Sequence, residues 1–127
     1  MEPQLIRSEK APAAIGPYAQ ATKVSGFVFC SGQIPLDPAT MQVVAGGVEA
    51  QTRQVLQNLT QVLAAAGCGL GDVAKTTIFL TDMADFKVVN GIYGEVFGDH
   101  RPARATVAVA GLPLGVLVEI DCVAHCG

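Results

Sequence analysis

The chain has 127 residues, of which 50% are hydrophobic and 15% are charged, and its net charge is −3. Soluble domains usually carry about 25% charged residues, so little polar material is present to cover a monomer. No apolar run approaches the roughly 20 residues of a membrane-spanning helix, so we expect no membrane partner and assign the apolar surplus to subunit interfaces in a homo-oligomer.

The distribution of charge bears on partners and compartment. The eight lysines and arginines are scattered without a basic run, which argues against a dedicated nucleic-acid binder. The segment from Met1 to Lys10 has no apolar signal core, so we expect a cytoplasmic protein. In that compartment the four cysteines are expected to be reduced thiols.

The first half of the chain predicts a β-hairpin followed by a long helix. Residues 20–24 and 27–31 flank a Ser-Gly break that suits a hairpin turn. After a loop rich in turn residues, a short strand is expected at 42–45. Apolar residues then recur at helical spacing from Val48 to Ala66, and Gly67 is placed to end that helix.

The second half predicts a strand, a second helix and two final strands. The segment 73–80 is rich in β-branched and aromatic residues and is expected to form a strand. A helix is expected at 85–97, with Asp82 or Asp85 as its N-terminal cap. Strands at 104–110 and 116–124 complete the chain.

These elements predict a single domain that covers residues 1–127. Its class is α+β, with two helices packed on one face of a mixed, mostly antiparallel sheet. The inward side of the second helix is expected to carry Phe86, Tyr93 and Phe97. Asn90 falls on the same side, where a polar side chain would need a partner.

Patterns that could suggest a cofactor, a metal or a nucleophile fail on context. The glycines of 67–71 follow a helix, whereas a dinucleotide fingerprint joins a strand to a following helix. Cys122, His125 and Cys126 lie close together, but a zinc site usually needs a second, separated pair of ligands. Ser31 lacks evident partners for a nucleophilic triad. We therefore expect neither a metal nor a cofactor.

A set of polar residues in apolar surroundings is the remaining signal. Strand alternation sends Glu119 to the face opposite the core, and Arg104 begins the preceding apolar strand. A structural interpretation pairs Arg104 with Glu119 in a salt bridge, whereas a functional one makes Arg104 part of a small anion site. Tyr18 and the Ser31-Gly32 pair lie at strand ends, where ligand-binding groups collect.

The chain resembles the reactive intermediate deaminases in segments that follow the family's order and cover nearly its whole length. These segments are APAAIGPYAQA, FCSGQIPLDP, VAKTTIFLTDMADFKVVN and PARATVAVAGLPLGVLVEI. The resemblance implies a chorismate-mutase-like α+β fold and a homotrimer with ligand sites in the clefts between subunits. It also implies hydrolysis of 2-iminoacids and their enamine tautomers, such as 2-aminoacrylate, to 2-ketoacids and ammonia.

The same resemblance implies roles for individual residues. The family's carboxylate-binding arginine falls on Arg104 and its acidic residue on Glu119. Its other substrate-binding positions fall on Tyr18, Ser31, Gly32, Asn90 and Thr106. Many members have a cysteine where this chain has Thr106, which excludes a mechanism that needs a thiol there. The backbone carbonyl that is proposed to contact water at that position is retained.

These residues suit imine hydrolysis without a metal or cofactor. A planar guanidinium can hold a carboxylate through two parallel hydrogen bonds, and Glu119 can orient a water and accept its proton. Two alternatives stay open. A non-catalytic sensor of small carboxylates or 2-ketoacids would use the same Arg104 site without turnover. An endoribonuclease or translation inhibitor would instead act on RNA, although the sequence has no evident histidine acid–base pair for that reaction.

Overall fold

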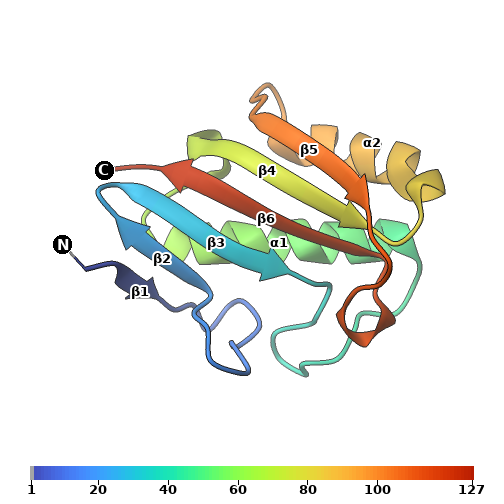
Figure 1. Ribbon diagram of the computed structural model, residues 1–127, viewed down its shortest axis with the longest axis horizontal. Coiled ribbons are helices and arrows are strands. Elements are labelled where there is room, and N and C mark those ends of the chain that lie inside the picture. Colours follow the sequence, from blue (N-terminus) through green and yellow to red (C-terminus); the bar gives the residue numbers. More distant parts are fainter. Residues whose placement is uncertain (1) are drawn as a thin grey trace.

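The computed structural model describes residues 2–127, which form a six-stranded sheet and two α-helices. The strands are β1 (Gln4–Ile6), β2 (Ala21–Val24), β3 (Phe27–Gln33), β4 (Val73–Leu80), β5 (Ala103–Ala108) and β6 (Val118–His125), and the helices are α1 (Val48–Ala65) and α2 (Phe86–Phe97). Across the sheet the strand order is β1-β2-β3-β6-β4-β5 (Figure 1). The β4–β5 pair is parallel and the other described pairs are antiparallel, which confirms the predicted mixed sheet.

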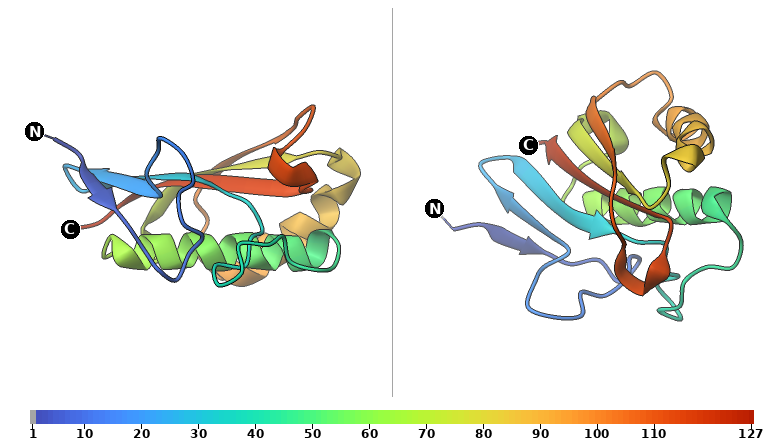
Figure 2. Two further views of the ribbon diagram at one scale, coloured as in Figure 1. Left: turned by 90° about the horizontal axis from the view of Figure 1, so that it is seen from below. Right: turned by 45° about the vertical axis from the view of Figure 1, so that its right-hand side comes forward.

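Both helices lie on the same face of the sheet, as the edge-on view of Figure 2 shows most clearly. Leu59 and Leu63 of α1 and Ile120 of β6 are among the fully buried side chains between these layers. The opposite face of the sheet carries no helix, and Phe29 of β3 is 47% exposed there. The α+β class with two helices on one face is therefore confirmed, and one face of the sheet is left open.

The helix boundaries have local causes. α1 ends at Ala65, and Gly67 follows with a φ of +83°, a left-handed conformation that glycine adopts without a steric penalty. The Asp82 side chain accepts a hydrogen bond of 2.9 Å from the Ala84 amide, and so it caps the 3₁₀ turn that leads into α2. Within residues 2–127, neither helix is long and apolar enough to cross a membrane.

Two short strands were not predicted correctly. The strand expected at 42–45 is absent, because Val43 makes only an isolated bridge to Leu36. β1 was missed; it covers three residues, two of them exposed, and exists because it pairs with the edge of β2. Segments this short carry no periodicity of their own, so pairing with a neighbour decides whether they become strands.

The cysteines differ from the expectation that all four are reduced. Cys68, in the turn after α1, is joined to Cys126, just beyond β6, by a disulfide with a Cα–Cα distance of 5.8 Å. The fold places the end of the last strand against the end of the first helix, which brings these two distant residues together. Cys30 and Cys122 are buried free thiols, as expected.

Candidate active site

Arg104 lies on the edge strand β5 and extends over the aromatic side chains of α2. Its Cζ atom is 4.9 Å from the centre of the Tyr93 ring and 5.6 Å from that of the Phe86 ring, which are cation–π distances. The side chain borders a cavity of about 490 Å³ between β5 and α2. The cavity is lined by Asn90, Tyr93, Gly94, Arg101, Pro102 and Arg104.

The Tyr93 ring that Arg104 contacts is held in place by its own neighbours. The Tyr93 hydroxyl shares a buried hydrogen bond of 2.6 Å with the Thr76 hydroxyl of β4, and the Phe97 ring lies 4.5 Å from the Tyr93 ring. Burial raises the pKa of Tyr93, so its hydroxyl stays protonated at neutral pH and its ring stays available to the guanidinium. The sequence signal for this support was the inward-facing stripe of α2.

Arg104 has no carboxylate partner within residues 2–127, where the one ion pair joins Arg53 to Glu95 at 3.1 Å. The structural interpretation, in which Arg104 forms a salt bridge with Glu119, is therefore wrong for the single chain. An arginine that is stacked on two rings but not paired with an acid remains able to bind an anion from outside.

Asn90 and Thr106 lie beside this arginine. Asn90 is exposed and lines the cavity, so the prediction that it shares the buried side of α2 was wrong. Thr106 lies two residues after Arg104 on the same face of β5, and its hydroxyl is buried without a hydrogen-bond partner among the described residues. Buried hydroxyls are normally paired, so this one is free to take a partner that the chain itself does not supply.

Glu119 and Gly32 form a second group on neighbouring strands. Cys30 pairs with Cys122 and Gln33 with Ile120, so β3 contains one extra residue here and bulges at Ser31-Gly32. The Glu119 carboxylate lies directly against this bulge. A Cβ added to Gly32 would lie 2.9 Å from the Glu119 Cδ, closer than real Cβ contacts allow. A glycine is therefore needed for the carboxylate to occupy this position.

Ser31 and Tyr18 complete this second group. The Ser31 hydroxyl donates a hydrogen bond of 2.7 Å to the Ala19 carbonyl, and its backbone amide donates one of 3.0 Å to the Gln20 carbonyl. These bonds tie the bulge to the segment that carries Tyr18. Tyr18 is 55% exposed and shares a cavity of about 190 Å³ with Gly32.

The electrostatics of the second group favour a proton acceptor. Burial raises the pKa of Glu119, and the nearby Asp121 carboxylate raises it further. Burial likewise raises the pKa of Asp121, and hydrogen bonds from Thr77 partly offset this increase. A carboxylate with a raised pKa accepts a proton more readily at neutral pH than an ordinary glutamate does.

The two groups lie on opposite faces of the sheet. Arg104 pairs with Thr76, and Thr76 pairs with Cys122, so all three lie in one row on the face that the helices cover. Glu119 alternates with the buried Val118 and Ile120 and therefore faces the open side. The sequence-predicted residues thus form two half-sites: Arg104 with Asn90 and Thr106, and Glu119 with Gly32, Ser31 and Tyr18.

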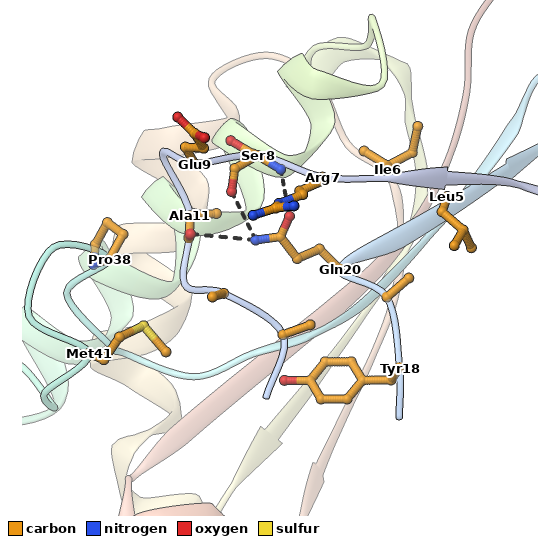
Figure 3. Close-up of a pocket in the computed structure, with 13 residues that line it drawn as sticks. Leu5, Ile6, Arg7, Ser8, Glu9, Ala11, Tyr18, Gln20, Pro38 and Met41 are labelled. Carbon is orange, nitrogen blue, oxygen red and sulfur yellow. Dashed lines mark hydrogen bonds between the residues drawn. The ribbon is translucent and has the colours of Figure 1, made fainter. Parts of the chain in front are cut away.

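A larger cavity of about 520 Å³ lies beside β1, and no sequence pattern predicted it. Figure 3 shows the Gln20 side chain at its centre, hydrogen-bonded to the segment that passes over it. Its Oε1 accepts a bond of 2.6 Å from the Ser8 amide, and its Nε2 donates one of 2.7 Å to the Pro12 carbonyl. The Gln20 amide is therefore occupied by bonds within the chain, which tie the segment that contains Ser8 and Pro12 to the start of β2.

The fold is that of the reactive intermediate deaminase family. The family described as Endoribonuclease L-PSP matches residues 8–126, and the chain belongs to this family. The chain is 50% identical over 121 residues to the mouse protein named 2-iminobutanoate/2-iminopropanoate deaminase, covering 95% of this chain and 90% of that one.

Solved structures agree with this assignment. A putative endoribonuclease from Thermotoga maritima superimposes with a TM-score of 0.96 at 49% identity, covering 100% of this chain and 99% of that one. TdcF from E. coli, solved with bound serine, superimposes with a TM-score of 0.93 at 40% identity, covering 98% of this chain and 99% of TdcF. Both likenesses extend over essentially the whole fold.

Proposed function

We propose that this protein hydrolyses 2-iminoacids, such as 2-iminopropanoate and 2-iminobutanoate, to 2-ketoacids and ammonia. The observation that carries the proposal is Arg104, stacked on Tyr93 and Phe86 beside a cavity, with no acidic partner among residues 2–127. A guanidinium held in this way suits the carboxylate that every 2-iminoacid carries. The mouse relative's name supports the same substrate class.

The complete site is proposed to form between two copies of the chain. Arg104 and Glu119 lie on opposite faces of the sheet, so one small substrate cannot contact both within a single chain. In a cyclic oligomer, one copy's Arg104 can meet another copy's Glu119, and the rotation repeats the same site around the ring. A homotrimer, as the family resemblance implies, fits this arrangement.

The open face of the sheet supports assembly. Phe27, Phe29 and Val107 are 44%, 47% and 41% exposed on it, although they lie in regular strands. Apolar side chains gathered on one uncovered face mark an interaction surface, and a second copy of the chain would cover them. Glu119 lies on this same face, so covering it also encloses the half-site that contains the carboxylate.

The reaction follows from the positions of the charged groups. Arg104 holds the substrate carboxylate, and Glu119 of the other copy accepts a proton from water as the water oxygen bonds to the imine carbon. The resulting tetrahedral carbinolamine loses ammonia and leaves the carbonyl of a 2-ketoacid. An enamine such as 2-aminoacrylate enters the same reaction after tautomerising to the imine. Because an iminium carbon is already electrophilic, orientation of the water supplies much of the acceleration.

The remaining residues orient the reactants. The bulge at Ser31 and Gly32 presents backbone and hydroxyl groups beside Glu119, and Tyr18 closes one side of that half-site. On the other copy, the unpaired Thr106 hydroxyl and the exposed Asn90 amide lie next to Arg104 and can bind polar atoms of the substrate.

Mixing two inactive variants tests the shared site. Arg104→Ala and Glu119→Gln each remove one half-site, so each alone is expected to lose most turnover of an imine that an amino-acid oxidase generates in place. When the two variants are unfolded together and refolded, random assembly gives about one quarter of the interfaces an intact Arg104 and an intact Glu119. Activity should therefore recover to about one quarter of the wild-type value.

Several outcomes would contradict the proposal. A mixture that stays inactive although mass spectrometry shows mixed oligomers would place both residues in one chain's site. A monomer by light scattering would refute the shared site. Binding of 2-ketoacids without any acceleration of ammonia release would identify a sensor, and RNA cleavage that Arg104→Ala abolishes would identify a ribonuclease.

A further inference from the structure

The structure separates the four cysteines into two pairs of different character. Cys30 and Cys122 lie directly opposite one another on β3 and β6, yet both are free and buried. Cys68 and Cys126 come from the ends of α1 and β6, and these two are bonded. Proximity alone therefore does not explain which pair is oxidised, and the surroundings of each pair must be compared.

The bonded pair lies beside a cation, and one of its two residues is partly exposed. The Lys23 Nζ atom lies 3.8 Å from the Cys126 Sγ and donates a hydrogen bond of 2.8 Å to the Ala66 carbonyl at the end of α1. An Asp72 carboxylate oxygen lies within 4.8 Å of both sulfurs and accepts a hydrogen bond of 2.8 Å from the Gly69 amide. Cys126 is partly exposed, whereas Cys68 is 7% exposed.

Cys30 and Cys122, the free pair, are expected to be unreactive. A hydrogen bond with Cys30 raises the pKa of Cys122, and burial raises it further, so this thiol stays protonated. Because the thiolate is the reactive form of cysteine, a protonated and buried thiol neither attacks an oxidant nor meets one.

We propose that Cys68 and Cys126 form a reversible two-thiol oxidation site that reacts with peroxides. The Cys126 thiolate attacks a peroxide oxygen, so an S–O bond forms, the O–O bond breaks, and the leaving oxygen takes a proton to become an alcohol or water. The Cys68 thiolate then attacks the sulfenic sulfur, so the S–S bond forms, the S–O bond breaks, and the leaving hydroxide takes a proton to become water. Two thiols lose two electrons and the peroxide gains them, and an added dithiol reverses the change.

The order of the two steps follows from exposure and charge. Cys126 is the more exposed residue of the two and has the Lys23 ammonium beside its sulfur, which stabilises a thiolate against the opposing effects of the Asp72 carboxylate and the Ala66 carbonyl. Cys68 is screened from solvent and lies within bonding distance, so it acts as the resolving thiol. The site is far from Glu119, because the six strand residues 120–125, at a rise of about 3.3 Å each, lie between it and Cys126.

A titration with hydrogen peroxide tests the proposal independently of the imine reaction. The reduced protein, freed of reductant, is treated with one equivalent of peroxide, and free thiols are counted after denaturation. The count is expected to fall from the four cysteines of the chain to the two that the structure leaves free. Peptide mapping should then recover a Cys68–Cys126 cross-link.

Variants separate the roles of the residues. Cys68→Ser should stop the reaction at a Cys126 sulfenic acid that dimedone traps, and Cys126→Ser should abolish the rapid phase. Cys122→Ala is the matched control and should form the disulfide at the normal rate. Lys23→Gln should slow oxidation roughly three- to tenfold at pH 7, and Lys23→Arg should restore it, because only the positive charge is required.

Three results would overturn the proposal. One is thiol loss no faster than in the urea-unfolded chain, and another is a cross-link between Cys30 and Cys122. The third is protection of both thiols from peroxide by stoichiometric Zn²⁺, which would assign Cys68, Asp72 and Cys126 to a metal site instead.

Discussion

Replacing Arg104 separates a ligand-binding role from a structural one. On the functional interpretation, Arg104→Ala and Arg104→Lys leave a folded oligomer that has lost its anion-binding group. On a structural interpretation, the same variants would lose stability first and activity as a consequence. The two interpretations therefore predict opposite orders of damage.

The structure sets the expected cost in stability. Arg104 is exposed and contacts two aromatic rings, and exposed cation–π contacts contribute about 0.5–1 kcal/mol each. Arg104→Ala should therefore lower the free energy of unfolding by no more than about 2 kcal/mol. A domain of this size changes its Tm by about 3–6 °C per kcal/mol, so the fall should not exceed about 12 °C.

The expected cost in ligand binding is larger. Two charge-assisted hydrogen bonds to a carboxylate contribute roughly 1.5–3 kcal/mol each, so losing both weakens binding roughly 10²- to 10⁴-fold. Lysine keeps the charge but offers no planar pair of donors, so Arg104→Lys should lose about one of the two bonds, roughly ten- to a hundredfold.

Both quantities can be measured on the same preparations. Calorimetry with pyruvate, a stable 2-ketoacid, reports carboxylate binding, thermal melts report stability, and the oxidase-coupled assay reports turnover. Arg53→Gln, which removes an equal charge from the ion pair between α1 and α2, is the control and should change neither binding nor turnover. Arg104 variants that remain active but melt far below the wild type would refute the reasoning.

Glu119, Gly32 and the disulfide can each be tested by substitution. Glu119→Gln should slow turnover but retain pyruvate binding. Glu119→Gln should also raise the Tm at neutral pH, because folding raises the pKa of Glu119 and so destabilises its charged form. The difference in Tm between variant and wild type should disappear as the pH falls through that pKa, and a difference that stays constant with pH would contradict the assignment. Gly32→Ala should push the flexible Glu119 carboxylate out of its position, because the added Cβ would overlap it, and so should reduce turnover while changing the Tm little; a Gly32→Ala variant with normal turnover would contradict the role of this carboxylate. Cys68→Ser should lower the free energy of unfolding by about 2–4 kcal/mol relative to the oxidised protein, because the disulfide closes a loop with a sequence separation of 58 residues and so restricts the unfolded chain. Equal Tm values for the oxidised and the reduced wild type would exclude this effect.

Long periodic elements of this fold could be predicted from sequence, and short ones could not. α1 begins at Val48 as expected and ends one residue early, and β4 covers the predicted residues 73–80. Both have enough apolar residues at regular spacing to determine their own conformation. β1 becomes a strand only because the edge of β2 is available, which is a property of the assembled sheet.

The candidate site shows a similar division. Strand alternation correctly placed Glu119 opposite the core, and the polar strand ends indicated Tyr18 and Ser31. The sequence could not show that Arg104 faces the other side of the sheet, because that depends on the order and register of the three strands β6, β4 and β5. The Cys68–Cys126 pairing escaped prediction for the same reason, since it requires the ends of α1 and β6 to meet.

The position of Glu119 also connects assembly with catalysis. In the single chain its pKa is already raised by burial, although the face on which it lies is uncovered. Covering that face with another copy removes more water from the carboxylate and disfavours its charged form further. The contact that brings Arg104 to the substrate would therefore also make Glu119 a stronger base. A monomeric variant made by placing charges at Phe27 and Phe29 should thus lose activity although its half-sites are unaltered, and a fully active monomer would disprove this coupling.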